Sequence, residues 1–280
     1  MTFGGPNQQM RGWSKHKLKY LRSYITSYRI ATKGTFETFY IDGFAGPGRL
    51  PDEDDNTLLV DGSPLIALEA DPPFRACYLI ELDSEVCDDL REATREFPNA
   101  RVVQGDANDE IPRILDTIHP KSPTLVVLDP TGVVGQVRWS TIAAIARRQT
   151  EVFINFPYHM AVQRILPIDQ NQMTDERAKE LSLYLPPGWQ EVYHRSVDPE
   201  RSGLCRRFLE LYRDQLRGLG YEYAYASSAF RTNGGIPLYY LIWAGKNKTG
   251  ARIAKHVILK QFNPQTIRLL DVEDSDWIAS

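Results

Sequence analysis

The chain has few cysteines, and they are not spaced to bind a metal. Three of its 280 residues are cysteine, namely Cys77, Cys87 and Cys205, with no CxxC pair and no histidine nearby in the sequence. This excludes the ligand spacing of a structural zinc site, and the odd number argues against a disulfide framework. We expect Cys87 and Cys205 to be buried thiols without a chemical role, in a protein of a reducing compartment.

Long hydrophobic runs are also lacking. Residues 1–13 have no apolar core of the kind found in signal peptides, and no apolar stretch approaches the roughly 20 residues that span a bilayer. We therefore expect no membrane association and a cytoplasmic location.

No excess of charge of one sign is present. The chain has 33 Lys and Arg against 36 Asp and Glu, a formal net charge of −3, so no overall positive field predicts nucleic-acid or membrane binding. Hydrophobic residues at 42% and charged residues at 25% are typical of globular proteins and exclude a disordered chain. The five histidines are scattered, so no cluster predicts a metal-dependent nuclease or other hydrolase.

What the sequence does contain is an alternation of short apolar strands and helical segments. A first helix is expected from Ser14, a potential N-cap, to Gly34. The later pattern predicts strands at 37–41, 76–81, 100–103, 124–128 and 152–154, with helices near 63–70, 84–96, 108–117 and 139–149. This indicates an α/β fold with a mostly parallel sheet and helices on both faces, in which polar residues at the strand ends converge on one crevice.

The alternation breaks over residues 158–203, where prolines and Gly188 predict an insertion too short for its own core. We then expect a helix at 204–219, an antiparallel pair of strands at 221–230 and 238–244, and an amphipathic segment at 253–262. The predicted organisation is an N-terminal helical segment (1–36), a Rossmann-like domain of seven strands with an antiparallel terminal strand (37–262), and a C-terminal tail (263–280).

The strongest local signal is the glycine-rich turn over 42–48, Asp-Gly-Phe-Ala-Gly-Pro-Gly, directly after the first predicted strand. Glycines permit positive torsions and close approach of a ligand to the main chain, and Asp42 can accept hydrogen bonds from a cationic or hydroxylated group. The spacing is not the dinucleotide-binding GxGxxG. It resembles the Phe-x-Gly-x-Gly motif of class I methyltransferases, although such a turn can also be purely structural. The resemblance implies that the methionine end of S-adenosylmethionine is held by Asp42, Gly43, Phe44, Ala45, Gly46 and Gly48.

Acids follow the next two strands in the order that this cofactor needs. Glu81 can accept both ribose hydroxyls, with Asp83 as the alternative. Asp106 can accept the adenine amino group, while the Ala107 amide donates to the ring. A single acid at a strand end is often a turn or helix cap, but acids at three successive strand ends favour a binding site.

The fourth predicted strand is followed by Asp129-Pro130-Thr131-Gly132. It occupies the position of the Asp/Asn-Pro-Pro-Tyr motif of methyltransferases that act on exocyclic amines. By that resemblance Asp129 and Pro130 are the catalytic candidates, accepting the amine hydrogens and directing its lone pair to the methyl group, and Asp129 also lines the cofactor site. Thr131 and Gly132 replace a proline and an aromatic residue, so the platform for a flipped base is missing there.

A related pattern, Asn155-Phe156-Pro157-Tyr158, follows the fifth predicted strand, whereas the methyltransferase motif follows the fourth. The pattern is also typical of a plain strand end and turn. We expect Asn155, Tyr158 and His159 to face the crevice as substrate-side residues, with Tyr158 supplying an aromatic surface.

Three groups of basic residues are candidates for phosphate contacts. The first helix carries four of them, on a face that is more typical of plain solvent exposure than of phosphate binding. If all three groups form one face, nucleic-acid binding weakens steeply as salt rises. The groups are Lys15, Lys17, Lys19 and Arg22; Arg147 and Arg148; and Arg201, Arg206 and Arg207.

Over its whole length the chain resembles the three-Cys-motif partner family, TcmP. The motifs that carry the resemblance lie at 15–18, 40–49, 61–68, 129–132 and 238–244. It implies a class I methyltransferase fold, S-adenosylmethionine as cofactor, no metal, and a protein partner that carries the three-cysteine motif. A similar pattern in methyltransferases that act on ribosomal-RNA adenine favours an RNA or DNA base as the acceptor. The alternative is a catalytically inactive module that binds the cofactor or a partner.

Overall fold

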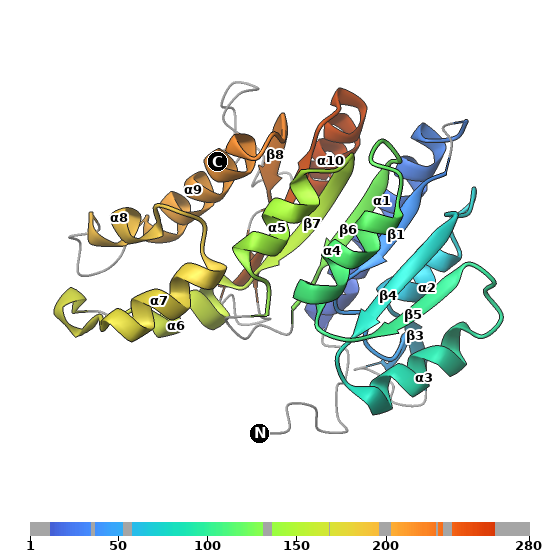
Figure 1. The fold of residues 1–280 in the computed structure, drawn as a ribbon, viewed down its shortest axis with the longest axis horizontal. Coiled ribbons are helices and arrows are strands. Elements are labelled where there is room, and N and C mark those ends of the chain that lie inside the picture. The colour runs from blue at the N-terminus through green and yellow to red at the C-terminus, as the bar shows by residue number, and fades with distance from the viewer. Residues whose placement is uncertain are drawn as a thin grey trace. The chain divides into compact units, whose positions relative to one another are not determined.

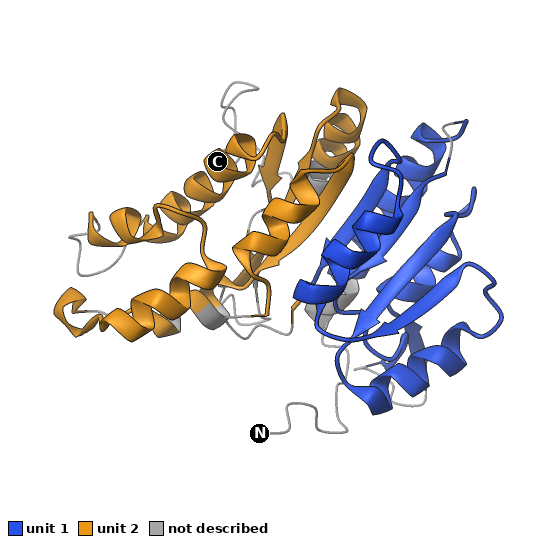
Figure 2. Cartoon of the chain, viewed as in Figure 1, with its two compact units in different colours: residues 1–129 blue, residues 130–280 orange. Residues whose placement is uncertain are grey.

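The computed structural model describes residues 12–34, 37–52, 58–130, 136–167, 169–195, 203–227, 229–231 and 237–260. The predicted tail at 263–280 lies outside these residues, as do Thr131, Gly132 and Arg201. Two compact units divide the chain after Asp129, as Figure 2 shows in blue and orange. The domain boundaries expected near residues 36 and 262 stay predictions.

Unit 1 contains four parallel strands in the order β5, β4, β1, β6 (Figure 1). Their bounds are Phe39–Asp42 for β1, Ala76–Glu81 for β4, Ala100–Gln104 for β5 and Thr124–Leu128 for β6. Every residue of β1 and β6 is buried, as expected for strands that are covered on both faces. Since the strand order reverses at β1, the loop after β1 leaves the sheet at a topological switch point, where ligands of open α/β sheets bind.

The helices of unit 1 begin where the sequence supplies N-caps or proline. Asp83 caps α3 (Ser84–Thr94), Asp106 caps α4 (Ala107–Thr117), and α2 (Ser63–Leu68) has Pro64 in its first turn. Helix α1 (Gly12–Ala31) begins two residues before the expected N-cap Ser14. A small antiparallel hairpin, β2 (Arg49–Pro51) with β3 (Leu59–Asp61), lies between the glycine-rich loop and α2 in the chain.

Unit 2 is built on antiparallel pairs. The buried strand β7 (Thr150–Phe156) pairs with β10 (Pro237–Gly245), which also pairs with β8 (Tyr223–Ala226) and β9 (Phe230–Arg231). Helices α5 (Trp139–Ala146), α9 (Leu204–Gly218) and α10 (Lys248–Lys260) complete this part of the fold. The predicted antiparallel pair is therefore confirmed, although β8 is shorter than the segment at 221–230.

The segment at 158–203 contains several short helices that pack on the rest of unit 2. They are a π-helix (Tyr158–Val162), α6 (Gln163–Ile165), a 3-10 helix (Gln170–Gln172), α7 (Asp175–Tyr184) and α8 (Trp189–His194). Helix α7 contacts α5 and α8 contacts α9, which buries Leu181 and Trp189. Together the elements confirm the predicted class, a Rossmann-like α/β fold with mostly parallel strands and an antiparallel β10.

Candidate functional site

The loop after β1 needs glycine at two positions for its backbone conformation. Gly46 and Gly48 have φ angles of 63° and 82°, in the left-handed region that favours glycine. A Cβ on Gly48 would also lie 3.2 Å from side-chain atoms of Leu90 and Ala93 on α3, whereas one on Gly46 would meet nothing within 4 Å. The loop is therefore packed on α3 at Gly48 and open at Gly46, which leaves main chain that a ligand can approach.

Gly43 is required for close packing instead. A Cβ there would lie 3.1 Å from Leu128 Cδ2 and 3.3 Å from Ile111 Cδ1. The Gly43 amide donates to the Val127 carbonyl at 2.9 Å, and the Ala45 amide donates to the Ile80 carbonyl at 2.9 Å. The start of the loop is thus held by main-chain bonds to both neighbouring strands.

Asp42, the last residue of β1, is a carboxyl group with 0% exposure. It accepts hydrogen bonds from the Tyr40 hydroxyl at 3.0 Å and from the Phe44 amide at 3.2 Å, and from the Ser63 side chain. Burial raises the pKa of Asp42 to about 6, the nearby negative charge of Asp129 adds to the rise, and the three hydrogen bonds oppose it. Among the described residues no cation forms an ion pair with Asp42, so a cationic ligand beside it would be favoured.

Glu81 joins the glycine-rich loop to the turn after β4. Its Oε2 accepts from the Gly46 amide at 3.0 Å, while its Oε1 accepts from the Leu82 and Asp83 amides at 2.8 and 3.1 Å. A carboxylate offers about four acceptor positions, so three main-chain donors leave room for a further one. Sequence reasoning predicted a ribose ligand here and missed this contact to the loop, because Gly46 is 35 residues away in the chain.

The acids Asp83 and Asp106 both cap helices, which is the structural alternative for acids at strand ends. Asp83 Oδ1 accepts from the Glu85 and Val86 amides at 2.9 and 3.3 Å. Asp106 Oδ1 accepts from the Asn108 amide and side chain, both at 2.8 Å, and among the described residues Oδ2 accepts no hydrogen bond. Capping by Oδ1 is therefore compatible with a ligand contact at Oδ2. Ala107, the first residue of α4, is buried.

Asp129, directly after β6, is paired with a lysine of the first helix. Lys17 Nζ lies 2.7 Å from Asp129 Oδ1 and 2.6 Å from Oδ2, and the two side chains are 14% and 29% exposed. Sequence analysis placed Lys17 among possible phosphate contacts on a solvated face. The structure instead places it beside the catalytic candidate, 112 residues along the chain.

In unit 2 the substrate-side candidates lie at the carboxyl end of β7 or just after it. Asn155 is buried in β7, and the Tyr158 ring is 2% exposed between Phe156 and Phe208. The aromatic surface expected from Tyr158 is thus covered. His159 is more open, with Nδ1 2.8 Å from Gln163 Oε1 and Nε2 3.5 Å from the Tyr240 hydroxyl.

The structure does not bring the basic candidates to that end of β7. Arg147 and Arg148 precede the strand, and the Arg148 carbonyl accepts from Lys246 Nζ at 2.9 Å. At about 3.3 Å per residue, the seven residues of β7 separate them from Tyr158 by roughly 20 Å. Among the remaining basic candidates, Arg206 pairs with Glu210 at 3.0 Å, and the Lys15 side chain lies outside what the structure describes.

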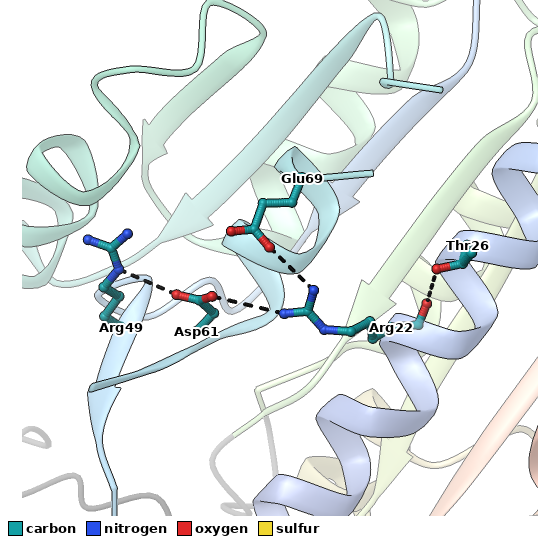
Figure 3. A network of polar contacts seen from close by, with 5 residues as sticks. All are labelled: Arg22, Thr26, Arg49, Asp61 and Glu69. Atoms are coloured by element: carbon teal, nitrogen blue, oxygen red, sulfur yellow. Dashed lines mark hydrogen bonds and ion pairs between the residues drawn. The ribbon is translucent and has the colours of Figure 1, made fainter. Parts of the chain in front are cut away.

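Arg22 belongs to a network that ties α1 to the β2–β3 hairpin (Figure 3). Its guanidinium lies 3.3 Å from Glu69 and 3.9 Å from Asp61, and Arg49 Nε lies 3.4 Å from the other Asp61 oxygen. The Gly62 amide, next to Asp61, donates to the Gly48 carbonyl at 2.7 Å. Arg22 therefore supports the glycine-rich loop indirectly, through the hairpin.

Two of the three cysteines are placed as structural thiols, whereas Cys205, which was expected to be buried, is partly exposed. Cys77 and Cys87 are buried, and burial raises the pKa of the Cys77 thiol well above its usual range and that of Cys205 to about 12. Within the described ranges no three His, Cys, Asp or Glu side chains are grouped to hold a metal ion. None of the helices in those ranges is long and apolar enough to cross a bilayer.

Comparison with known proteins supports the fold of this chain and does not extend to its function. No protein-family model and no curated protein sequence matches the chain. Among solved structures, a Legionella pneumophila protein of family DUF519 has a TM-score of 0.51 at 10% identity, over 89% of this chain and 94% of that one. Spermidine synthase from Thermotoga maritima scores 0.44 at 11% identity, covering 94% and 67% of the two chains. TYW2 from M. jannaschii, solved with AdoMet, scores 0.38 at 10% identity, covering 84% and 77%.

Proposed function

We propose that this protein is an S-adenosylmethionine-dependent methyltransferase that acts on an exocyclic amine of an RNA or DNA base. The observation that carries the proposal is the arrangement in unit 1, where acids end β1 and β4 and follow β5 and β6, the four neighbouring strands of one parallel sheet. They stand around a glycine-rich loop at the switch point of that sheet, where open α/β sheets bind their ligands.

The residues present fit this cofactor. Buried Asp42 lies next to main chain that is open at Gly46, which suits the cationic methionine end. Glu81 would accept a ribose hydroxyl while it holds the Gly46 amide, with Asp83 beside it. The adenine would meet Asp106 Oδ2 and the Ala107 main chain, and Leu82, 70% exposed, offers an apolar surface for the ring. When bound, the cofactor supplies an activated methyl group on a sulfonium centre.

Asp129 would position the acceptor. As a carboxylate held by Lys17, it can accept N–H bonds from an amine and so direct the nitrogen lone pair away from itself. Orientation of this kind is a large part of catalysis when the leaving group is already activated. The role of the neighbouring Pro130 carbonyl as a second acceptor belongs to the same proposal, as do the TcmP relationship and a partner with a three-cysteine motif.

A second candidate is a cofactor-binding module without transfer activity. It is favoured by the covered ring of Tyr158 and by Thr131 and Gly132, which stand where an aromatic platform would be needed. This candidate shares the cofactor site and differs only in the absence of transfer.

Calorimetric titration with S-adenosylmethionine and its demethylated product, combined with labelled methyl transfer to RNA and DNA pools, tests the proposal. Glu81→Ala should weaken cofactor binding by about tenfold or more, since it loses a ribose partner and releases the Gly46 amide. Asp129→Ala should abolish transfer and leave cofactor binding largely intact. The matched control is Glu85→Ala, an exposed acid on α3, which should change neither.

Wild-type protein that binds neither ligand would overturn the proposal. Binding without transfer to any pool would favour the inactive module. Equal loss of cofactor affinity in the Glu81 and Asp129 variants would contradict the division of roles between them.

A further inference from the structure

The Lys17–Asp129 pair lies next to the proposed cofactor loop. Asp129 follows β6, and β6 pairs with β1 in a register that sets Val127 against Asp42. The negative charge of Asp129 is felt at Asp42, which in turn holds the Phe44 amide of the loop. The pair therefore stands beside the proposed methionine end of the site, within unit 1.

Lys17 is on the buried stripe of α1 and not on its solvated face. Tyr20, Leu21 and Tyr24 follow it at three, four and seven positions, and all three are buried. Residues at these spacings share one side of a helix, so packing of α1 directs the Lys17 side chain towards the sheet. Lys19 and Arg22 lie on the opposite side and are exposed.

The two side chains have complementary hydrogen-bonding properties. A carboxylate accepts and cannot donate, and an ammonium donates and cannot accept. Lys17 Nζ contacts both oxygens of the Asp129 carboxylate, and one of these two contacts alone would hold the pair. If a ligand replaced the second contact, Asp129 would present one hydrogen-bond acceptor and Lys17 one donor, side by side.

Building on the proposed function, we propose that Lys17 and Asp129 together select an amine that is flanked by a ring nitrogen, the edge that adenine and cytosine present. The amine N–H bonds to the Asp129 oxygen that is released, and the Lys17 N–H that is released bonds to the ring nitrogen. An alkyl amine lacks the neighbouring acceptor and brings a competing positive charge, and uracil has no amine. Lys17 is thus a positioning residue for Asp129 and a determinant of specificity.

The methyl transfer that follows needs no reactant besides the acceptor amine and the cofactor. The amine nitrogen gives its lone pair to the methyl carbon as the carbon–sulfur bond breaks, and that bond's electrons stay on sulfur. The methylated nitrogen then loses one proton to water. Throughout, Lys17 holds one Asp129 oxygen, so the carboxylate keeps its orientation.

The test compares Lys17→Met, Lys17→Arg and the control Lys33→Met, an exposed lysine just after the end of α1. Random single-stranded RNA and DNA pools in which adenine or cytosine is the only base with an amine serve as probes. The pool that is methylated is then remade with the deaza base that lacks a ring nitrogen beside the amine (1-deaza- and 7-deazaadenine, or 3-deazacytosine). Calorimetry with S-adenosylhomocysteine reports the cofactor site separately.

We expect wild type and the Lys33 variant to lose about tenfold or more in rate with one of the deaza bases, because a hydrogen bond from a charged group is lost. Lys17→Met should be slower by a similar factor on the natural base, show no further loss with the deaza base, and keep its S-adenosylhomocysteine affinity within about twofold. Lys17→Arg should recover part of the rate, since it restores a donor.

A wild-type rate in Lys17→Met, or indifference of wild type to every deaza base, would overturn the inference. Wild type that binds S-adenosylhomocysteine but methylates only alkyl amines, or neither pool, would overturn it while leaving the cofactor site standing. Failure of wild type to bind S-adenosylhomocysteine would overturn the proposed function and the inference with it.

Discussion

Asp42 is held by hydrogen bonds from Tyr40 and Phe44, and its side chain has no exposed surface. Burial raises the pKa of its carboxyl group from 3.8 to about 6. The folded chain therefore binds this proton more tightly than the unfolded chain does. The contribution of Asp42 to the free energy of unfolding falls as pH rises between about 4 and 6 and stays lower above that range.

Asp42→Asn removes this titration. The difference in free energy of unfolding, variant minus wild type, should shift in favour of the variant by about 2.4 kcal/mol between pH 4 and pH 7, because most of the roughly two-unit rise in pKa acts within that range. Urea denaturation at several pH values measures it, with the exposed Glu85→Gln as a control that should be flat. A difference that does not change with pH would contradict the assignment.

At the scale of elements, the β2–β3 hairpin connects the first helix to the glycine-rich loop. Asp61 forms ion pairs with Arg22 and Arg49, and the Gly62 amide donates to the Gly48 carbonyl. The Arg22 and Arg49 side chains are 52% and 48% exposed, so each ion pair contributes little to global stability. Their effect should be local, on the position of the hairpin.

Asp61→Asn should therefore change the free energy of unfolding by less than about 1 kcal/mol but speed hydrogen exchange at the Asp52 and Gly62 amides, which bond to Leu58 and Gly48. Salt at about 1 M should have the same effect on wild type, because exposed charges are screened. The control is Glu92→Gln, which breaks the exposed Arg95 pair on α3. Unchanged exchange in Asp61→Asn, or equal acceleration in the control, would refute this role.

At the scale of the whole molecule, charge limits how nucleic acid can bind. The chain has a net charge of −3, and three of its predicted phosphate contacts, Lys17, Arg22 and Arg206, already pair with acids. Fewer of the predicted contacts can then replace counterions along a strand. Under the proposed function, recognition of the acceptor should therefore depend mainly on contacts with the base.

If a nucleic acid is the acceptor, its binding should depend only weakly on salt. Each phosphate contact to a single strand contributes about −0.7 to the slope of log affinity against log salt, so we expect a slope no steeper than about −2. Fluorescence anisotropy with a single-stranded RNA of about 20 nucleotides, at roughly 50 to 300 mM KCl, measures it. A slope near −5 would indicate a broad basic face and contradict this expectation.

The sequence determined the parts of this protein that depend on local pattern. The buried strand β6 is an almost continuous apolar run, glycines mark the loop at 42–48, and the acids at the strand ends can be read in order. The β2–β3 hairpin was missed because its strands have three residues each, too few for an alternating pattern.

Only the tertiary structure decided which of these residues meet. Lys17 reaches Asp129 across 112 residues, and Glu81 reaches the Gly46 amide across 35. Packing of α1 turned Lys17 towards the sheet, and packing in unit 2 covered the Tyr158 ring, which sequence analysis had expected to be open. Composition and spacing do not predict such contacts. Which helix face or which ring is buried depends on surfaces that distant parts of the chain supply.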